Sequence, residues 1–319
     1  MLKFYKNSLF FVILIFLCSN LFATKYAGEI FRMGAGVKNF ALGNCGLTDE
    51  NSYAPAYWNS ALLIKATNNK FEIMHAEEYM GLLTYDTASA IWGNENKFSL
   101  VITRIGIADI PLTKLTDPTI EPDSLNRPYE YKSVNNSDLV VYFGFARKIG
   151  NYNIGFTPKI AYRHLAEENG FGFGADISTF FELSEKWMIA AKIRDFFTTQ
   201  ILWGNGTHEI VNPGFDLETK YKFIFPVIKR SSNFYTGFEI FTENRGDASN
   251  ISLSFFSLDY HLGLEMNIHE KADLYIGYDI NHFTSGISIG YRNWKINYSL
   301  ELDTNDLDNS HRVSISLDL

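Results

Sequence analysis

A strict alternation of apolar and polar residues over long segments constrains this chain most. From Phe256 to Ile268 the even positions carry apolar side chains, whereas the odd positions are mostly polar. Successive side chains of a β-strand point to opposite faces, so this segment predicts a strand with one apolar and one polar face. The pattern recurs in segments 274–280, 294–303 and 313–319. Strands of about ten residues are longer than most globular strands and suit an oblique crossing of a bilayer.

The whole pattern predicts an all-β chain, a transmembrane antiparallel β-barrel of about fourteen strands with an N-terminal plug. An even number of strands suits a closed antiparallel barrel. Beyond the N-terminus no run of 18 or more apolar residues exists, which excludes a bundle of membrane-spanning helices. The strands are expected near residues 69–79, 81–92, 97–107, 137–148, 152–164, 170–183, 186–199, 215–227, 233–243, 255–268, 272–282, 284–292, 294–303 and 310–319.

The expected connections differ between the two ends of this barrel. Short turns follow every second strand, and long loops at the other end include 108–136, 200–214, 244–254 and 304–309. Outer-membrane barrels have short periplasmic turns and long external loops, so both ends of the mature chain are expected in the periplasm. Four prolines lie in the first long loop, where no strand ladder needs their missing amide, namely Pro111, Pro118, Pro122 and Pro128. A secreted β-sandwich would also alternate, but the strand lengths and the unequal rims favour the barrel.

The N-terminus has the pattern of a secretory signal peptide, which we expect to span residues 1–23. Two lysines precede an apolar run that ends at Cys18, and Ala23 offers a cleavage site. Lipidation of Cys18 is the alternative, but Leu17 stands where a lipoprotein signal has a small residue. Cleavage would leave Cys45 as the single cysteine, so no intrachain disulfide is expected. Export and the barrel together predict the cell outer membrane of a Gram-negative-type bacterium.

Composition agrees with this location once the alternation is considered. The net charge of −8 argues against a nucleic-acid partner, which needs a basic surface. Mean hydropathy is −0.09, as in a soluble protein, yet aromatic residues make up 16% of the chain, as in proteins with aromatic belts at a lipid interface. Polar inward residues offset apolar outward ones in the average, so both values suit one alternating wall.

Residues 24–67, which precede the first strand, are expected to plug the barrel formed by residues 68–319. The segment is rich in glycine and small residues, which let a backbone bend and pack closely. A barrel this wide would enclose an open channel unless something filled it.

Several short motifs carry a family resemblance. They are the glycine-rich stretch 31–43, the acidic pair Asp49-Glu50, the run Tyr57-Trp58-Asn59 before Ala61-Leu62, and segment 109–113. With the fourteen strands, these motifs resemble the PorV/PorQ outer-membrane proteins, relatives of FadL-type long-chain fatty-acid transporters. Two residues depart from the expected pattern: Ser60 replaces a proline after Asn59, and the chain ends on Leu319 instead of an aromatic residue.

The resemblance implies two different functions. As a PorV/PorQ-type protein, the chain would be an accessory protein of type IX secretion or of cell-surface protein assembly, with secretion-system subunits and exported cargo proteins as partners. As a FadL-like channel, it would take up long-chain fatty acids or other hydrophobic solutes and release them sideways through a gap in the wall. Large external loops favour a protein partner slightly. In either case, the barrel would contact outer-membrane lipid.

Two sets of residues are candidates for the functional site. Plug or ligand-contact candidates are Phe31, Arg32, Met33, Tyr57, Trp58 and Asn59, and lumen-facing polar candidates are Asp259, His261 and Glu265. Packing within the plug is the simpler interpretation of Tyr57 and Trp58. Three alternating glycines, Gly170, Gly172 and Gly174, indicate close backbone approach, with a lateral opening as the alternative.

No enzyme activity, cofactor or metal site is expected. Ser257 and His261 share a face but lie roughly 13 Å apart at about 3.3 Å per residue, beyond hydrogen-bond reach. The seven histidines form no metal-binding motif. Gly34 and Gly36 lack the third glycine of a dinucleotide-binding fingerprint.

Overall fold

The computed structural model describes residues 27–302 and 309–319 and confirms a closed antiparallel barrel of fourteen strands. Each barrel strand pairs with its two neighbours, and the last strand closes the wall by pairing with the first. The barrel strands are β1 (Lys70–Glu78), β2 (Leu83–Trp92), β3 (Phe98–Lys114), β4 (Tyr129–Ile149), β5 (Tyr152–Leu165), β6 (Glu168–Glu182), β7 (Trp187–Arg194), β10 (Gly214–Phe225), β11 (Arg230–Phe241), β13 (Phe256–His269), β14 (Ala272–Asp279), β15 (His282–Tyr291), β16 (Trp294–Leu302) and β17 (Ser310–Asp318). The predicted signal peptide, residues 1–23, lies outside the described residues.

The wall has its polar face inward and its apolar face outward. In β13, Ser257 and Asp259 are fully buried, whereas the alternating apolar side chains between them are partly exposed. Exposed large apolar side chains occur on most barrel strands, including Ile73, Phe143, Phe171 and Ile296. A water-soluble protein would bury such side chains, so this outer face is suited to lipid.

The closed hydrogen-bonded wall predicts a specific behaviour on gels. The protein should fractionate with outer membranes and migrate faster unheated than boiled, because the intact barrel is compact and resists detergent until it is heated. Fractionation and paired heated and unheated samples measure this. A soluble periplasmic pool without a heat-dependent shift would contradict the barrel.

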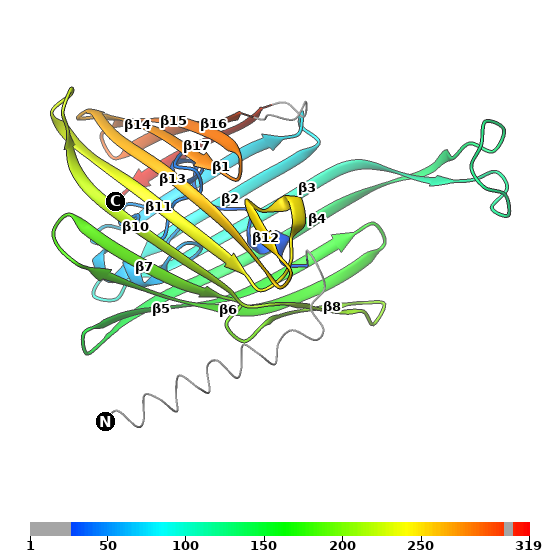
Figure 1. Cartoon of the computed structure of the whole chain (residues 1–319), viewed down its shortest axis with the longest axis horizontal. Helices are drawn as coiled ribbons and strands as arrows, with labels where there is room; N and C mark the ends of the chain where they lie inside the picture. The colour runs from blue at the N-terminus through cyan, green and yellow to red at the C-terminus, as the bar shows by residue number, and fades with distance from the viewer. Residues whose placement is uncertain (1–26, 303–308) are drawn as a thin grey trace.

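Residues 27–69 lie inside the barrel and form short elements there, as Figure 1 shows. These are η2 (Glu29–Phe31), α2 (Val37–Ala41) and η3 (Ser60–Lys65). Gly34 and Gly36 have φ values of 84° and 83°, a region that favours glycine, so they permit the bends before α2. Among the described residues, no helix is long and apolar enough to cross a membrane. Cys45 is a buried free thiol.

The plug runs along the lumen from the long-loop end to the short-turn end. Gly28 lies against Val211 near the long-loop end, whereas Lys65 pairs with Glu182 at the short-turn end. The N-terminal end of the mature chain, which was expected in the periplasm, lies outside the described residues. The first described residues lie near the long-loop end. Packing inside the lumen places these residues near the rim opposite the short turns.

The turn that lacks its expected proline still forms. The Asn59 side chain accepts a hydrogen bond from the Ala61 backbone N–H at 3.0 Å and caps η3. The Ser60 hydroxyl lies 2.6 Å from the Thr157 hydroxyl of the wall. A side-chain cap thus replaces the backbone restriction that a proline would supply.

The first predicted loop is largely strand instead. β3 and β4 continue beyond the ends of their outer neighbours as a two-stranded ribbon, which projects far from the barrel in Figure 1. Pro111 lies in this ribbon opposite Ser133, so its predicted loop position is wrong. A proline is tolerated there because the ribbon's outer edge has no neighbouring strand to receive its missing N–H.

The other long connections also contain unpredicted structure. Segment 200–214 contains most of β8 (Thr199–Trp203) and all of β9 (His208–Val211), and segment 244–254 contains η4 (Gly246–Ala248) and β12 (Ile251–Leu253). The strand predicted at 186–199 instead stops at Arg194. Short polar hairpins lack the long alternation on which the prediction relied. Residues 303–308 of the last predicted loop lie outside the described residues.

Candidate functional site

The barrel wall is interrupted between β7 and β8 and between β9 and β10. β7 and β8 both pair with β6, but residues 195–198 separate them, and Asp195 and Thr198 adopt positive φ values of 52° and 65°. Next to this break in the wall, Asn212 and Pro213 separate β9 from β10. On the long-loop side of the break, β9 pairs with β8, and the other edge of β9 has no strand partner among the described residues. We call residues 195–198 and 212–213 the seam.

Buried charges hold the seam in place. The Lys159 ammonium lies 2.8 Å from a carboxylate oxygen of Asp176 and 2.7 Å from one of Asp195. The Asp195 backbone N–H donates to Asp176 at 2.9 Å. All three side chains are at most 2% exposed. The pairing turns the kinked backbone of residue 195 toward the lumen.

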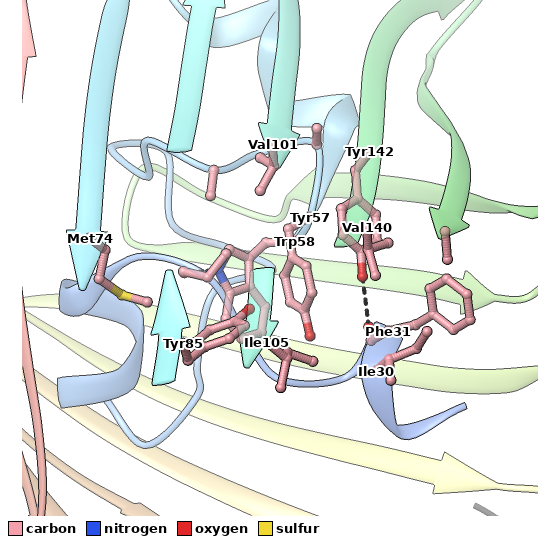
Figure 2. Close-up of a cluster of buried hydrophobic side chains, with 14 of the residues drawn as sticks. Ile30, Phe31, Tyr57, Trp58, Met74, Tyr85, Val101, Ile105, Val140 and Tyr142 are labelled. Carbon is pink, nitrogen blue, oxygen red and sulfur yellow. Dashed lines mark hydrogen bonds between the residues drawn. The ribbon is translucent and has the colours of Figure 1, made fainter. Parts of the chain in front are cut away.

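The plug covers the inner side of the seam. The Lys159 ammonium lies 4.9 Å from the centre of the Phe31 ring, and the Tyr142 hydroxyl donates to the Phe31 carbonyl at 3.2 Å (Figure 2). A Cβ atom added at Gly28 would lie 2.6 Å from a Val211 methyl carbon. The plug therefore packs on β9 beside the seam and on β4 and β5 of the adjoining wall.

The alternating glycines of β6 make this close packing geometrically permissible. A Cβ added at Gly174 would lie 1.9 Å from the Thr199 hydroxyl oxygen, and one added at Gly172 would lie 3.3 Å from Phe31. Close backbone approach therefore explains these glycines. They lie beside the seam, and a lateral opening at the seam, the alternative interpretation, would require glycines at the same positions.

Four charged residues fasten the plug to the loop between β11 and β13. Glu29 contacts Arg245 at 3.0 Å, and Arg32 lies 3.5 Å from Glu243. Arg32 and Arg245 both lie over the Phe241 ring, at 4.6 and 4.2 Å from its centre. We call Glu29, Arg32, Glu243 and Arg245 the charge clasp. Glu29 is 40% exposed, so the clasp is partly accessible to solvent and salt.

An aromatic cluster forms the middle of the plug, with several of its members labelled in Figure 2. The Tyr57 ring packs edge-to-face on Trp58 and on Tyr142, with ring centres 4.8 and 5.3 Å apart. Trp58 donates its ring N–H to the Ala35 carbonyl at 2.7 Å, and the Gly34 N–H donates to the Tyr57 hydroxyl at 2.9 Å. These contacts give both rings a packing role. Met33 packs against the same cluster.

In the middle of β10, a single wall carboxylate holds three consecutive plug amides. Glu218 accepts hydrogen bonds from the backbone N–H groups of Gly46, Leu47 and Thr48 at 2.8, 3.1 and 2.8 Å. The Thr48 hydroxyl also donates to Glu218, at 2.5 Å. Charged hydrogen bonds of this kind are stronger than neutral ones, so Glu218 is a principal anchor of the plug.

The three lumen-facing candidates have separate environments. Asp259 lies 3.2 Å from Arg245, beside the clasp. The His261 Nδ1 atom lies 2.9 Å from Asp279. Glu265 contacts the plug directly, because its carboxylate lies 2.9 Å from the Lys38 ammonium. The structure thus brings Glu265 onto the plug, whereas Asp259 reaches the plug only through Arg245, which pairs with Glu29.

Plug pairing predicts a broad pH window of docking. Burial alone would raise the pKa of Asp49, but the Lys38 ammonium outweighs it and holds this pKa below its ordinary value of 3.8. Burial alone would lower the pKa of Lys38, but Asp49 and Glu265 hold it well above its ordinary value of 10.5. The Asp49 contribution is present above its unfolded pKa and is lost as pH falls through the lowered value. The Lys38 contribution is present below its unfolded pKa and is lost as pH rises through the raised value.

Asp49 pairs with Lys38 inside the plug, whereas Glu265 ties Lys38 to the wall. The plug should therefore stay ordered and docked from about pH 4 to pH 10, loosening internally below that range and losing its Lys38 contacts above it. Protease protection of the plug, measured with proteases active at each pH, tests this. Release of the plug between pH 5 and pH 8 would contradict it.

Comparison with known proteins shows the fold. No protein-family model and no curated protein sequence matches the chain. The toluene transporter TbuX of Ralstonia pickettii matches at a TM-score of 0.56 and 10% identity, over 89% of this chain and 97% of that one. The toluene transporter TodX of Pseudomonas putida matches at 0.57 and 10%, over 94% and 99%. A Pseudomonas aeruginosa FadL homologue matches at 0.50 and 6%, over 89% and 98%.

These similarities and the lipid-suited outer face establish an outer-membrane barrel with the FadL-type fold. The narrower PorV/PorQ resemblance stays a prediction.

Proposed function

We propose that the protein is a FadL-like outer-membrane channel for small hydrophobic molecules, and that these molecules leave through the seam. The observation that carries the proposal is the interrupted wall at residues 195–198, with the plug packed on its inner side. A channel for apolar solutes needs a route from the lumen into lipid, and a break in strand pairing is where a wall can part most readily. Similar folds in two toluene transporters support this class of substrate.

The chemistry of the short-turn end supports lateral exit. A recess of about 470 Å³ there is lined by charged side chains, among them Glu50, Lys65 and Lys220. Lys65 and Lys220 both form ion pairs with Glu50, so charged side chains cover the plug at this recess. A charged recess does not remove the surface of an apolar molecule from water, so it does not stabilise such a molecule. The seam instead presents an apolar side chain, because Phe197 is 71% exposed.

The secretion hypothesis has one structural feature in its favour. The ribbon formed by β3 and β4 beyond the barrel rim has free strand edges, to which a partner strand can add. Exposed Leu125 and Ile120 lie at its tip. Cross-linking through residues 108–136 should capture translocon subunits or exported cargo under this second proposal. Normal protein export in cells that lack the gene would contradict it.

Uptake by vesicles tests the channel directly. Liposomes containing the purified protein should accumulate toluene or oleate faster than empty liposomes and faster than liposomes containing the protein with its plug cross-linked. Equal rates in all three preparations would contradict a channel for hydrophobic solutes.

A reversible cross-link tests the role of the seam. With Gly28→Cys and Val211→Cys, the two Cβ atoms should lie within the 3.5–4.5 Å that a disulfide requires, because Gly28 contacts Val211. Oxidation should slow uptake about tenfold or more by holding the plug on the seam, and dithiothreitol should restore it. The single variants, treated identically, are the controls. Cys45 is buried and should not interfere. Unchanged uptake in a fully oxidised double variant would contradict exit through the seam.

A further inference from the structure

A small cavity lies in the lumen between the plug and the wall strands β1, β13, β14, β15 and β16. It encloses about 160 Å³. A water molecule takes up about 30 Å³ in the liquid, so the cavity has room for about five waters or for a small organic molecule. Polar side chains form much of the lining, among them Asn39, Ser52 and Tyr53 of the plug and Glu72, Tyr275 and Asn297 of the wall.

Glu72 is a buried carboxylate of this lining, with 2% of its surface exposed. The Ser314 hydroxyl donates to its Oε1 atom at 2.7 Å, and the Asn297 amide donates to the same atom at 3.4 Å. The Oε2 atom accepts no hydrogen bond from the described residues, and the ammonium groups of Lys70 and Lys295 act on Glu72 only from beyond ion-pair distance. A buried carboxylate is costly without a positive charge beside it, so Glu72 points to a cationic occupant.

The charges around the cavity also favour a cation. Lys38 lies 2.9 Å from both Asp49 and Glu265, so its charge is already balanced. Lys295 is 40% exposed and lies 3.9 Å from Asp318. The described carboxylates on or next to the cavity are Glu72, Glu265, Asp273, Asp49 and Asp318, against the ammonium groups of Lys38, Lys70 and Lys295. This excess of carboxylates attracts positive charge into the cavity.

Two tyrosines of the lining already hold cations against their rings. The Lys70 ammonium lies 5.2 Å from the centre of the Tyr53 ring, and the Lys38 ammonium lies 6.0 Å from the centre of the Tyr275 ring. Aromatic rings attract organic ammonium ions in the same way. Among the described residues, no three His, Cys, Asp or Glu side chains are grouped so that they could hold a metal ion. The cavity therefore suits an organic cation better than a metal ion.

The cavity communicates with the short-turn end of the barrel. A recess of about 340 Å³ at that end shares Asn51 and Lys295 with the cavity, and both residues are at least partly exposed. Because the short turns of outer-membrane barrels are periplasmic, this recess gives the cavity access from the periplasm.

We propose that the cavity binds a small primary ammonium ion that enters from the periplasm. Its N–H groups donate to the free Oε2 atom of Glu72 and to neighbouring oxygens, and its short carbon chain fills the remaining space beside the tyrosines. The ligand contacts Glu72 of the wall together with Asn39 and Ser52 of the plug. Its binding therefore strengthens the docking of the plug in the lumen.

Binding of ethylammonium chloride to the detergent-solubilised full chain tests the proposal, measured by saturation-transfer NMR at neutral pH. Glu72→Gln conserves the side-chain volume and an oxygen that can accept from Ser314, but it removes the negative charge. This variant should bind ethylammonium about tenfold or more weakly than wild type. Glu182→Gln is the matched control, because Glu182 lies at the same end of the barrel and does not line the cavity. It should bind with wild-type affinity.

Proteolysis of the plug and a change of background salt complete the test. Ethylammonium should slow proteolysis of the plug in wild type and in Glu182→Gln but not in Glu72→Gln. In wild type, replacing background tetramethylammonium chloride by sodium chloride at fixed ionic strength should change the ethylammonium affinity by less than about twofold.

Each variant is first checked for the heat-dependent gel shift, and the salt exchange in wild type serves if Glu72→Gln fails to fold. Absence of binding to wild type, wild-type affinity in folded Glu72→Gln, or an equal loss in Glu182→Gln would overturn the site. A loss of about tenfold or more in sodium chloride would overturn the assignment to an organic ammonium ion. Binding without slower proteolysis of the wild-type plug would overturn its role in docking.

Discussion

Replacing Lys159 by methionine should destabilise the barrel by about 3–5 kcal/mol, the usual effect of breaking a buried ion pair. Lys159 is 1% exposed, and its ammonium is shared by Asp176 and Asp195. Methionine conserves most of the side-chain volume but removes the positive charge that balances the two buried carboxylates. Lys192, 3.0 Å from Asp176, would still pair with one of them. The carboxylate of Asp195 should therefore account for most of the loss.

Unfolding in urea from lipid vesicles measures this effect as a shift of the midpoint. The matched control is Lys132→Met, which breaks the exposed pair of Lys132 with Glu167 and should leave the midpoint unchanged. The double variant Lys159→Met with Asp195→Asn should recover part of the loss, because it removes the uncompensated charge. Equal midpoints for Lys159→Met and wild type would show that the buried cluster does not hold the seam.

Replacing Glu218 by alanine should release residues 46–48 of the plug from β10. Three backbone donors of residues 46–48 would lose their acceptor, and each buried donor left without a partner costs roughly 1–3 kcal/mol. A loss of about 3 kcal/mol shifts the docking equilibrium by a factor on the order of 100. The wall itself should remain closed, because the strand pairing of β10 uses backbone groups.

Two measurements together report release. Conductance of single barrels in planar bilayers should rise, and trypsin should cut after Lys38, which is shielded in the docked plug. Glu218→Gln should have an intermediate effect because an amide keeps one acceptor oxygen. Glu185→Ala, on the exposed turn between β6 and β7, is the control. Wild-type conductance together with wild-type cleavage in Glu218→Ala would show that other contacts suffice to hold the plug.

These two variants separate the stability of the wall from the docking of the plug. Lys159 contacts both the seam and Phe31, so its loss should also loosen the plug near the long-loop end. Glu218 contacts residues 46–48 of the plug, whereas Lys159 contacts Asp195 of the seam. If the seam is the exit, uptake of toluene should change more in Lys159→Met than in Glu218→Ala, at temperatures where both remain folded.

Alternation along single segments was enough to predict the wall. The phase that puts Asp259 and His261 on one face of β13 and Leu258 and Tyr260 on the other is visible in the sequence and present in the structure. Fourteen strands could be read in the same way, whereas the plug was predicted from the glycine-rich composition of residues 24–67 and the width of the barrel. The interruption at residues 195–198 could not, because Phe196 and Phe197 look like the continuation of a strand.

The contacts that hold the plug were also beyond sequence reasoning. Lys159, Glu218 and Arg245 stand at inward positions of their segments or in a loop, so each could be recognised as a charge in or near the lumen. Nothing local indicates that Glu218 meets residues 46–48, which are 170 to 172 positions away in the chain.

By itself, then, the sequence determined the closed wall and its inward and outward faces, because side-chain alternation is a local property of each strand. The glycine-rich composition of residues 24–67 and the width of the barrel indicated material in the lumen. Only the tertiary structure decided where the wall is interrupted, which end of the lumen the first plug residues reach, and which charges fasten them. Those features depend on pairings across the lumen between segments far apart in the chain, and barrel closure and strand register bring these together.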